Sequence, residues 1–227
     1  MIFYLDNPVF NALVSGEAHW ALGTEHVKFF DKEVSPFVGF DVQYKNGFTD
    51  LHQLLPSGRN ILFASRHEIP TPNGWKLRHH IPGNQFLFES KIAFENTFSE
   101  VTPLNQNHVD EMINLAKLTK PGPFDKRTIV FGNYHGIFRD EKLVAMTGRR
   151  LHVYDFTEIS AVCTHPDFTG KGFAANLIKH QINSILKENK TPFLHVRSDN
   201  NIAIGLYKKL GFVQNGEMHF YFLQRAD

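Results

Sequence analysis

The sequence has a single cysteine, no long hydrophobic run and almost no excess of charge of either sign. Cys163 has no second cysteine to pair with, so an internal disulfide is excluded. No apolar stretch approaches membrane-spanning length or has a signal-peptide pattern, so we expect a cytoplasmic protein and no membrane partner. The 24 basic and 23 acidic residues almost cancel, so nucleic acid is not expected as a partner either.

Phenylalanine and histidine, in contrast, are abundant, with 22 and 13 residues. Many phenylalanines stand in alternating or paired positions, which is typical of packing into cores. The histidines are scattered, and His79 and His80 point to opposite faces if their segment is a strand. We therefore expect no metal site. A histidine-metal hydrolase stays as a minor alternative that stoichiometric metal in the purified protein would support.

The chain is long enough for one large domain or two small ones, and we place a boundary near residue 96. Residues 1–95 would form an accessory α/β domain. They alternate strand-like runs such as NILFAS and NQFLFES with the turn clusters LPSGRN, PTPNGW and IPGN. We identify no catalytic motif in this part.

Residues 96–227 follow a clearer pattern. A helical period over 104–116 ends at the proline-rich stop signal 120–123, and three strand-like runs then predict an antiparallel meander. A helix from 172 to about 189, a strand, a helix from about 201 to 210 and a last strand complete the pattern. The fold class is therefore α/β with a mixed sheet.

The stretch HPDFTGKGFAANLI, residues 165–178, joins a strand to an amphipathic helix through two glycines. A helix N-terminus has free backbone N–H groups and a partial positive charge, and glycines let an anion approach the backbone. Gly170, Lys171, Gly172, Phe173 and Ala174 can therefore form a phosphate cradle. The alternative is a tight turn that binds nothing.

Two blocks, AVCTHPDFTGKGFAANLI and FLHVRSDNNIAIGLYKKLGF, resemble the GCN5-related N-acetyltransferases (GNAT), and within them the FR47-like group. The family's pyrophosphate loop, Arg/Gln-x-x-Gly-x-Gly/Ala, falls on residues 169–174, where Thr169 offers a hydroxyl in place of the leading Arg or Gln. The second block matches the family's Asn, Ala, Tyr and Gly-Phe spacing from Asn200 to Phe212. The resemblance covers about residues 97–227.

The resemblance implies the GNAT acyl-CoA N-acyltransferase fold with acetyl-CoA as cosubstrate. It places the pyrophosphate on the loop and the start of the helix that follows, and the pantetheine arm in a gap beside the preceding strand, bonded to exposed backbone. Asn200 would contact the cofactor or cap its helix, and Cys163 would be a small buried thiol. The cofactor-binding set is Val162, Cys163, Thr164, Thr169, Gly170, Lys171, Gly172, Phe173, Ala174, Ala175, Asn200 and Tyr207.

Acetyl transfer to an amine requires removal of a proton from the amine and stabilisation of the departing thiolate. The resemblance assigns the general acid to Tyr207, although its place in a helical stripe also suits a core residue. The resemblance points to two candidate bases. Glu158 lies in the third meander strand, and His195 lies in the strand FLHVRS, and we leave the choice between them open.

The predicted function is therefore transfer of an acetyl group from acetyl-CoA to a primary amine of a small molecule, peptide or protein. The alternative from another class is a non-catalytic acyl-CoA sensor or scaffold, which the substitution at Thr169 favours. Residues 1–95 would be a degenerate second copy of the same fold that shapes the acceptor pocket, with RHEIPTPNGWKLRHH as one wall. A homodimer is a further expectation. The sequence does not identify the acceptor.

Overall fold

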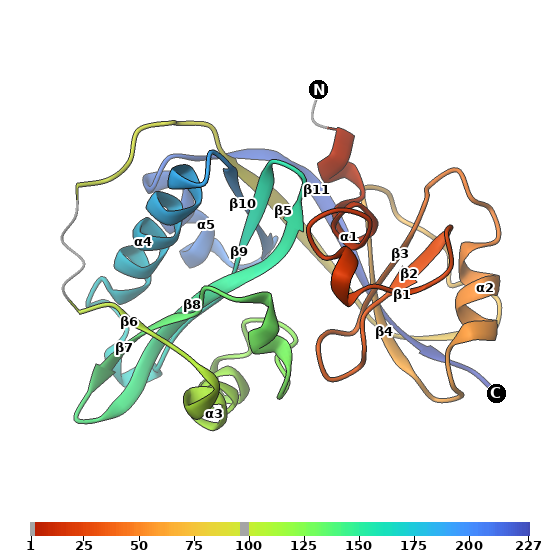
Figure 1. Cartoon of the computed structure of the whole chain (residues 1–227), viewed down its shortest axis with the longest axis horizontal. Helices are drawn as coiled ribbons and strands as arrows, with labels where there is room; N and C mark the ends of the chain where they lie inside the picture. The colour runs from red at the N-terminus through yellow and green to blue at the C-terminus, as the bar shows by residue number, and fades with distance from the viewer. Residues whose placement is uncertain (1–2, 96–99) are drawn as a thin grey trace.

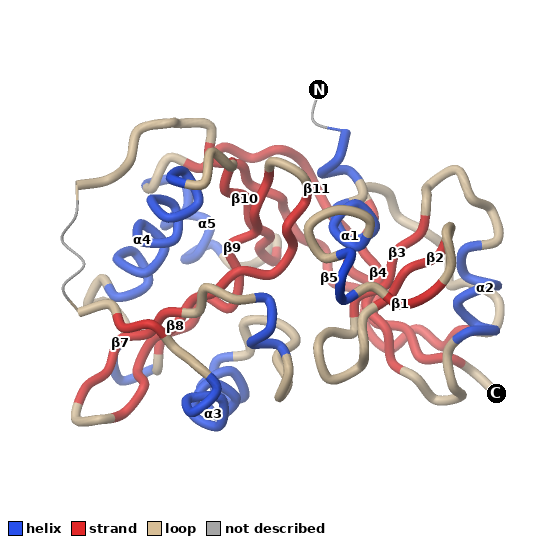
Figure 2. The backbone as a smooth tube through the Cα atoms, in the orientation of Figure 1, coloured by secondary structure: helices blue, strands red, loops and turns tan. Residues whose placement is uncertain are grey.

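The computed structural model describes residues 3–95 and 100–227, and its strands form one continuous 11-stranded sheet. The strand order across the sheet is β1-β2-β3-β4-β11-β5-β10-β9-β8-β7-β6. Helices pack against this sheet at both ends of the molecule (Figure 1, Figure 2). The predicted α/β class with a mixed sheet is confirmed.

The elements follow the chain in two groups, one before and one after residues 96–99. The first group comprises α1 (Pro8–Leu13), β1 (Leu22–Gly23), β2 (Val27–Phe29), β3 (Phe37–Phe40), α2 (Gly47–Leu54), β4 (Asn60–Ser65) and β5 (Trp75–Phe88). The second comprises β6 (Thr102–Pro103), α3 (Val109–Thr119), β7 (His135–Arg139), β8 (Lys142–Val153), β9 (Phe156–Thr164), α4 (Phe173–Lys187), β10 (Thr191–Arg197), α5 (Asn201–Lys209) and β11 (Phe212–Arg225). Every helix and strand predicted in the second part is present.

The two parts of the chain interlock through their longest strands. β5, from the first part, lies between β10 and β11, and β11 in turn pairs with β4 of the first part. Figure 1 shows β11 crossing from the side of α4 and α5 to the side of α2, where the C-terminus lies. The predicted boundary near residue 96 falls within 96–99, outside the described residues, and stays a prediction.

One expectation for the first part is wrong. IPGN, residues 81–84, was predicted as a turn cluster but lies inside β5, which begins at Trp75. Its glycine serves close packing, because a Cβ on Gly83 would lie 2.9 Å from the carbonyl oxygen of Val196 in β10. The prediction that His79 and His80 face opposite sides is confirmed, since both are consecutive residues of this regular strand segment.

The sheet is packed on both faces. Leu87 belongs to the core cluster that α1 and α3 share, whereas its neighbours Phe86 and Phe88 belong to the cluster of α4 and α5. Because consecutive strand residues point to opposite faces, the two helix pairs cover opposite faces of the sheet. Because helices cover both faces, a cavity can form where neighbouring strands of the sheet separate.

β9 and β10 separate after a short stretch of parallel pairing. They pair only where residues 191–193 meet residues 156–158. β10 then continues beside β5, while β9 bends at a bulge centred on Ala161, whose φ is +52°. The backbone of β9 beyond Glu158 therefore has an unpaired edge on this side, which confirms the predicted gap between the two strands.

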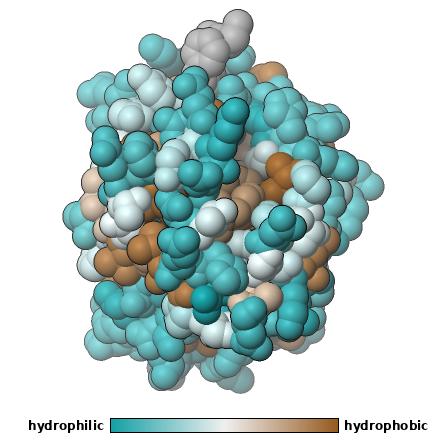
Figure 3. Space-filling view, turned by 90° about the vertical axis from the view of Figure 1, so that its right-hand side faces the viewer, coloured by the Kyte–Doolittle hydropathy of each residue, from teal (hydrophilic) through white to brown (hydrophobic). Residues whose placement is uncertain are grey.

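The face beyond α2 is mainly hydrophilic, with hydrophobic atoms in small separate groups (Figure 3). Among the described residues, no helix has both the length and the apolar character needed to cross a bilayer.

Candidate active site

A cavity of about 970 Å³ occupies the gap between β9 and β10. Its walls are the free edge of β9, the loop before α4 with the first turn of that helix, the end of β10, and α5 along its length. Lys171 and Glu158 do not line it. The predicted residues that do line it are Val162, Cys163, Thr164, Thr169, Gly170, Gly172, Phe173, Ala174, Ala175, His195, Asn200 and Tyr207.

The glycine loop presents a row of free donors to this cavity. Within the described chain, no hydrogen bond uses the backbone N–H groups of residues 170–175. Gly170 and Gly172 have φ of +77° and +80°, and a Cβ built on either would meet no atom within 4 Å. The glycines therefore provide both the left-handed backbone and the open space that an anion on these N–H groups needs.

Three polar side chains around the loop have local partners. The hydroxyl of Thr169 donates to the carbonyl oxygen of Pro166 at 3.0 Å, and the Lys171 ammonium lies 4.6 Å from the centre of the Phe168 ring. Asn200 accepts a hydrogen bond from the N–H of Ala203 at 3.1 Å and so caps α5. What the loop offers to an anion is therefore mainly backbone N–H groups rather than side chains.

Tyr207 brings a free phenol to the cavity. Its ring packs between Phe86 and Phe212, and no hydrogen bond joins its hydroxyl to another described residue. Burial raises the pKa of Tyr207 to about 12. The hydroxyl therefore keeps its proton at neutral pH and is available as a donor.

Cys163 also lines the cavity but is unsuited to act as a nucleophile. Burial raises the pKa of its thiol to about 12, so the thiolate that nucleophilic attack requires is not populated at neutral pH. A mechanism through an acylated cysteine is therefore disfavoured.

The two candidate bases are in direct contact. Nδ1 of His195 lies 2.7 Å from Oε1 of Glu158, and Arg150 donates two hydrogen bonds to the same carboxylate, at 2.5 and 2.8 Å. Glu158 is completely buried. Burial alone would raise its pKa, but the Arg150 guanidinium outweighs that effect and lowers the pKa to about 2. Glu158 is thus a permanent carboxylate that orients His195.

The tautomer of His195 follows from its second neighbour, Gln85. Arg66 can only donate, and it lies 2.6 Å from the side-chain oxygen of Gln85. The amide nitrogen of Gln85 consequently faces Nε2 of His195, at 2.9 Å, and donates to it. The proton of His195 therefore sits on Nδ1, toward Glu158. Burial lowers the pKa of His195, so the ring is neutral at pH 7.

Comparison with known proteins agrees with this geometry. Residues 134–221 match the FR47-like protein family. A structure from Novosphingobium aromaticivorans, assigned to the GNAT family of acetyltransferases, is 28% identical, with 99% of each chain covered and a TM-score of 0.90. The whole chain therefore has the GNAT acetyltransferase fold, and the match to the FR47-like group lies in residues 134–221.

More distant structures share the GNAT fold alone. A GCN5-related N-acetyltransferase from Kribbella flavida is 13% identical, with 97% of this chain and 96% of that chain covered and a TM-score of 0.59. A Drosophila protein is also 13% identical, with coverage of 88% and 74% and a TM-score of 0.65. No curated protein matches the chain.

This chain has a second cavity, of about 800 Å³, which meets the first at a common wall. The residues that line both are Lys120, Pro121, Arg150, His195, Val196 and Arg197. Its remaining walls come from β3, β4, β5, α3 and β11. Arg78 and His79, from the predicted wall segment 66–80, are among them. Gln85, Arg66 and Arg150 could not be found from local signals, because no motif links residues so far apart in the chain.

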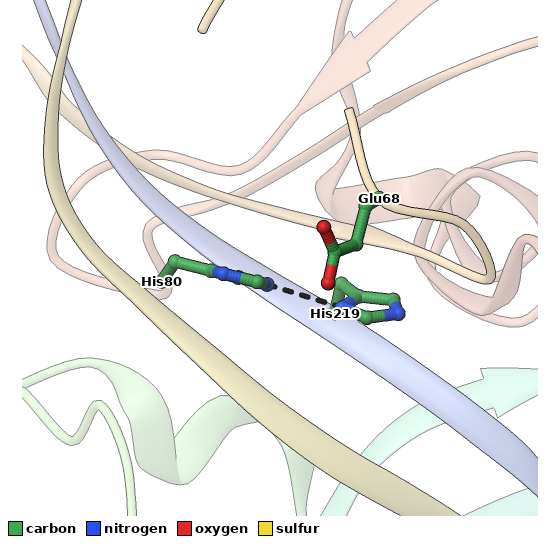
Figure 4. Close-up of side chains that lie close together, drawn as sticks. All are labelled: Glu68, His80 and His219. Carbon is green, nitrogen blue, oxygen red and sulfur yellow. Dashed lines mark hydrogen bonds between the residues drawn. The ribbon is translucent and has the colours of Figure 1, made fainter. Parts of the chain in front are cut away.

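One group of described residues in this chain could hold a metal ion: Glu68, His80 and His219 (Figure 4). Nε2 of His80 and Nδ1 of His219 are already joined by a hydrogen bond of 3.1 Å, and His80 stacks on Tyr221. None of the three ligands lines either cavity. The group therefore lies apart from the candidate active site.

Proposed function

We propose that this chain is an N-acetyltransferase that uses acetyl-CoA and transfers the acetyl group to a primary amine by direct attack. The observation that carries the proposal is the meeting of two cavities at His195. One cavity combines free N–H donors, an unpaired strand edge and a free phenol. The other cavity is lined by the same histidine.

Residues of the first cavity would hold the cosubstrate. The N–H groups of residues 170–175 suit a pyrophosphate, and the unpaired edge at Val162, Cys163 and Thr164 suits an extended amide-bearing arm. The chemistry supplied by the bound acetyl-CoA is an activated thioester. The protein then has to provide a neutral amine and a donor for the departing sulfur.

His195 is the proposed proton acceptor. It has the tautomer that a general base requires, with its Nδ1 proton directed at Glu158, which stabilises the imidazolium once it forms. In the free protein, Nε2 accepts a hydrogen bond from Gln85, so the incoming amine must replace that contact. Lys120 also lines both cavities and has no ion-pair partner among the described residues, so its positive charge disfavours the protonated form of a nearby amine.

Tyr207 is the proposed proton or hydrogen-bond donor to the sulfur. Its hydroxyl is protonated at neutral pH and has no competing protein partner among the described residues. Backbone N–H groups along β9 would add donors for the oxyanion.

A second candidate function is an acyl-CoA sensor without catalysis. Two observations favour it: the hydroxyl of Thr169 is used by Pro166, and both ring nitrogens of His195 have protein partners.

Two measurements on the same protein separate these functions. Calorimetry measures coenzyme A binding, and thiol release from acetyl-CoA measures transfer to a panel of primary amines. An acetyltransferase shows both, and His195→Gln lowers the transfer rate by about a hundredfold while binding persists. A sensor binds without releasing thiol for any amine. Absence of coenzyme A binding would show that the proposal is wrong.

A further inference from the structure

The second cavity is rich in cations and has no acidic lining residue. Five basic residues line it, although the whole chain carries almost equal numbers of basic and acidic residues. The cavity therefore concentrates positive charge that the composition does not predict. Its basic residues are Arg78, Lys117, Lys120, Arg150 and Arg197.

The cations fall into two groups. Arg150 and Arg197, on the wall next to the first cavity, are paired with the carboxylates of Glu158 and Asp199. For the remaining three, no ion pair with a carboxylate is present in the part of the chain that the structure describes. Arg78 donates only to the neutral side chain of Gln224. Two of these unpaired cations, Arg78 on β5 and Lys117 on α3, line the second cavity alone, whereas Lys120 belongs to the common wall with His195.

A β-bulge turns Arg78 toward this cavity. His79 pairs with Phe222 and Leu77 with Leu223, so Arg78 is the extra residue between two consecutive pairs. A bulge redirects side chains that a regular strand would alternate, which lets both Arg78 and His79 line the same cavity.

An apolar floor runs between Arg78 and His195. His195 of β10 pairs with Gln85 of β5. From Gln85, β5 runs back through Ile81, which pairs with Phe220 of β11, to His79. Ile81, Phe220 and Phe222 all line the cavity. Arg78 is seven residues from Gln85 along β5, a span of roughly 20 Å at the rise of an extended strand.

We infer that the acceptor is an elongated amino carboxylate: an amine joined through an apolar body to an anionic group. This inference rests on the proposed acetyltransferase function and names its acceptor class. The amine lies at His195, the apolar body covers Ile81 and the phenylalanines, and the carboxylate binds at Arg78 and Lys117. Polycationic amines are disfavoured by the same charges.

The test compares amines that differ only in the charge of the distal group. The probes are 6-aminohexanoate, 8-aminooctanoate and 11-aminoundecanoate, each against its neutral amide, with kcat/KM measured by thiol release from acetyl-CoA. The remote group leaves the amine chemistry of each pair nearly unchanged. We expect the acid to be preferred by about tenfold or more in the longer pairs, and the preference to fall with added salt.

Variants identify the cations responsible. The double variant Arg78→Gln/Lys117→Gln should reduce the acid-to-amide preference to about threefold or less, because the charge-assisted hydrogen bonds are lost. Lys76→Gln is the matched control, since Lys76 is an exposed cation of the same strand outside the cavity. It should retain the full preference.

The outcomes separate the two levels of the proposal. If coenzyme A does not bind and no thiol is released, the acetyltransferase assignment fails, and the acceptor class fails with it. If coenzyme A binds but no thiol is released with any amine, the protein is a sensor and both levels fail. If thiol is released with other primary amines but no acid exceeds its amide at any length, the acceptor class alone is wrong. It is also wrong if the preference survives in the double variant.

Discussion

The two cavities of this protein differ in the chemical groups that they offer to a ligand. The first offers free backbone groups, the N–H groups of residues 170–175 and the unpaired edge of β9, and all of its walls come from the second part of the chain. The second is formed by side chains from both parts. The first should therefore bind a constant group, and the second is where selectivity can vary.

The wall between the two cavities contains residues that contact both of them. His195 and Arg150 face both cavities, and the buried Glu158 holds the two together. Arg66 and Gln85, from the first part of the chain, extend the network. The interlocked strands β5 and β11 therefore do more than join the parts, since β5 supplies the residue that sets the tautomer of His195.

The largest effect is expected from breaking this common wall. Glu158→Gln leaves the largely buried Arg150 without its counter-charge and should lower the free energy of unfolding by about 3–5 kcal/mol at pH 7, measured by urea denaturation. The exposed pair of Arg139 and Glu100 gives the control, because Glu100→Gln should cost less than about 1 kcal/mol. Equal losses in the two variants would contradict a structural role for the wall.

The same variant has a defined pH dependence. The pKa of Glu158 is lowered from 4.5 to about 2, so its pairing stabilises the fold fully above pH 4.5 and loses this effect as the pH falls toward 2. The difference in unfolding free energy between the wild type and Glu158→Gln should therefore shrink over that interval. A difference that stays constant down to pH 2 would argue against the ion pair as its source.

Tyr207→Phe tests the proposed role of the Tyr207 hydroxyl as donor to the departing sulfur. We expect kcat for acetyl transfer to fall by about a hundredfold, because the donor to the sulfur is removed. Coenzyme A affinity should be largely retained, since the N–H groups of residues 170–175 are untouched. Tyr154→Phe, at an exposed tyrosine, is the control and should leave kcat unchanged. If both variants have wild-type kcat, Tyr207 is only a core residue.

Gly172→Val tests whether the free N–H groups of residues 170–175 bind coenzyme A. The side chain would enter the open space before the N–H groups, and we expect coenzyme A affinity to fall by about tenfold or more in calorimetry. Gly58 offers a close control, because it has φ of +73° and the same open surroundings but lines neither cavity. Gly58→Val should carry the backbone strain without the loss of affinity. Similar losses in both would assign the effect to strain.

The smallest effect is expected from metal removal. Glu68, His80 and His219 lie outside both cavities, so dialysis against a chelator should not change the rate of thiol release. A loss of activity that zinc restores would instead connect this group to the reaction.

The sequence predicted the first cavity well because its parts are local. The meander, the glycine turn and α4 each follow from residues close together in the chain, through periodicity and the conformational freedom of glycine. Gly170 and Gly172 in fact have the left-handed backbone that the turn requires. The contact between Glu158 and His195 was not predicted, and the sequence treated them as alternatives.

By itself, the sequence determined the order of elements in residues 96–227 and the glycine turn before α4, because hydrogen bonding within a turn or helix depends on neighbours in the chain. The gap beside β9 was expected from the family resemblance. Only the tertiary structure decided that β5 enters the second part's sheet, that Gln85 fixes the proton on His195, and that Arg78 and Lys117 share a cavity. These contacts join residues far apart in sequence, and only packing of the complete sheet brings them together.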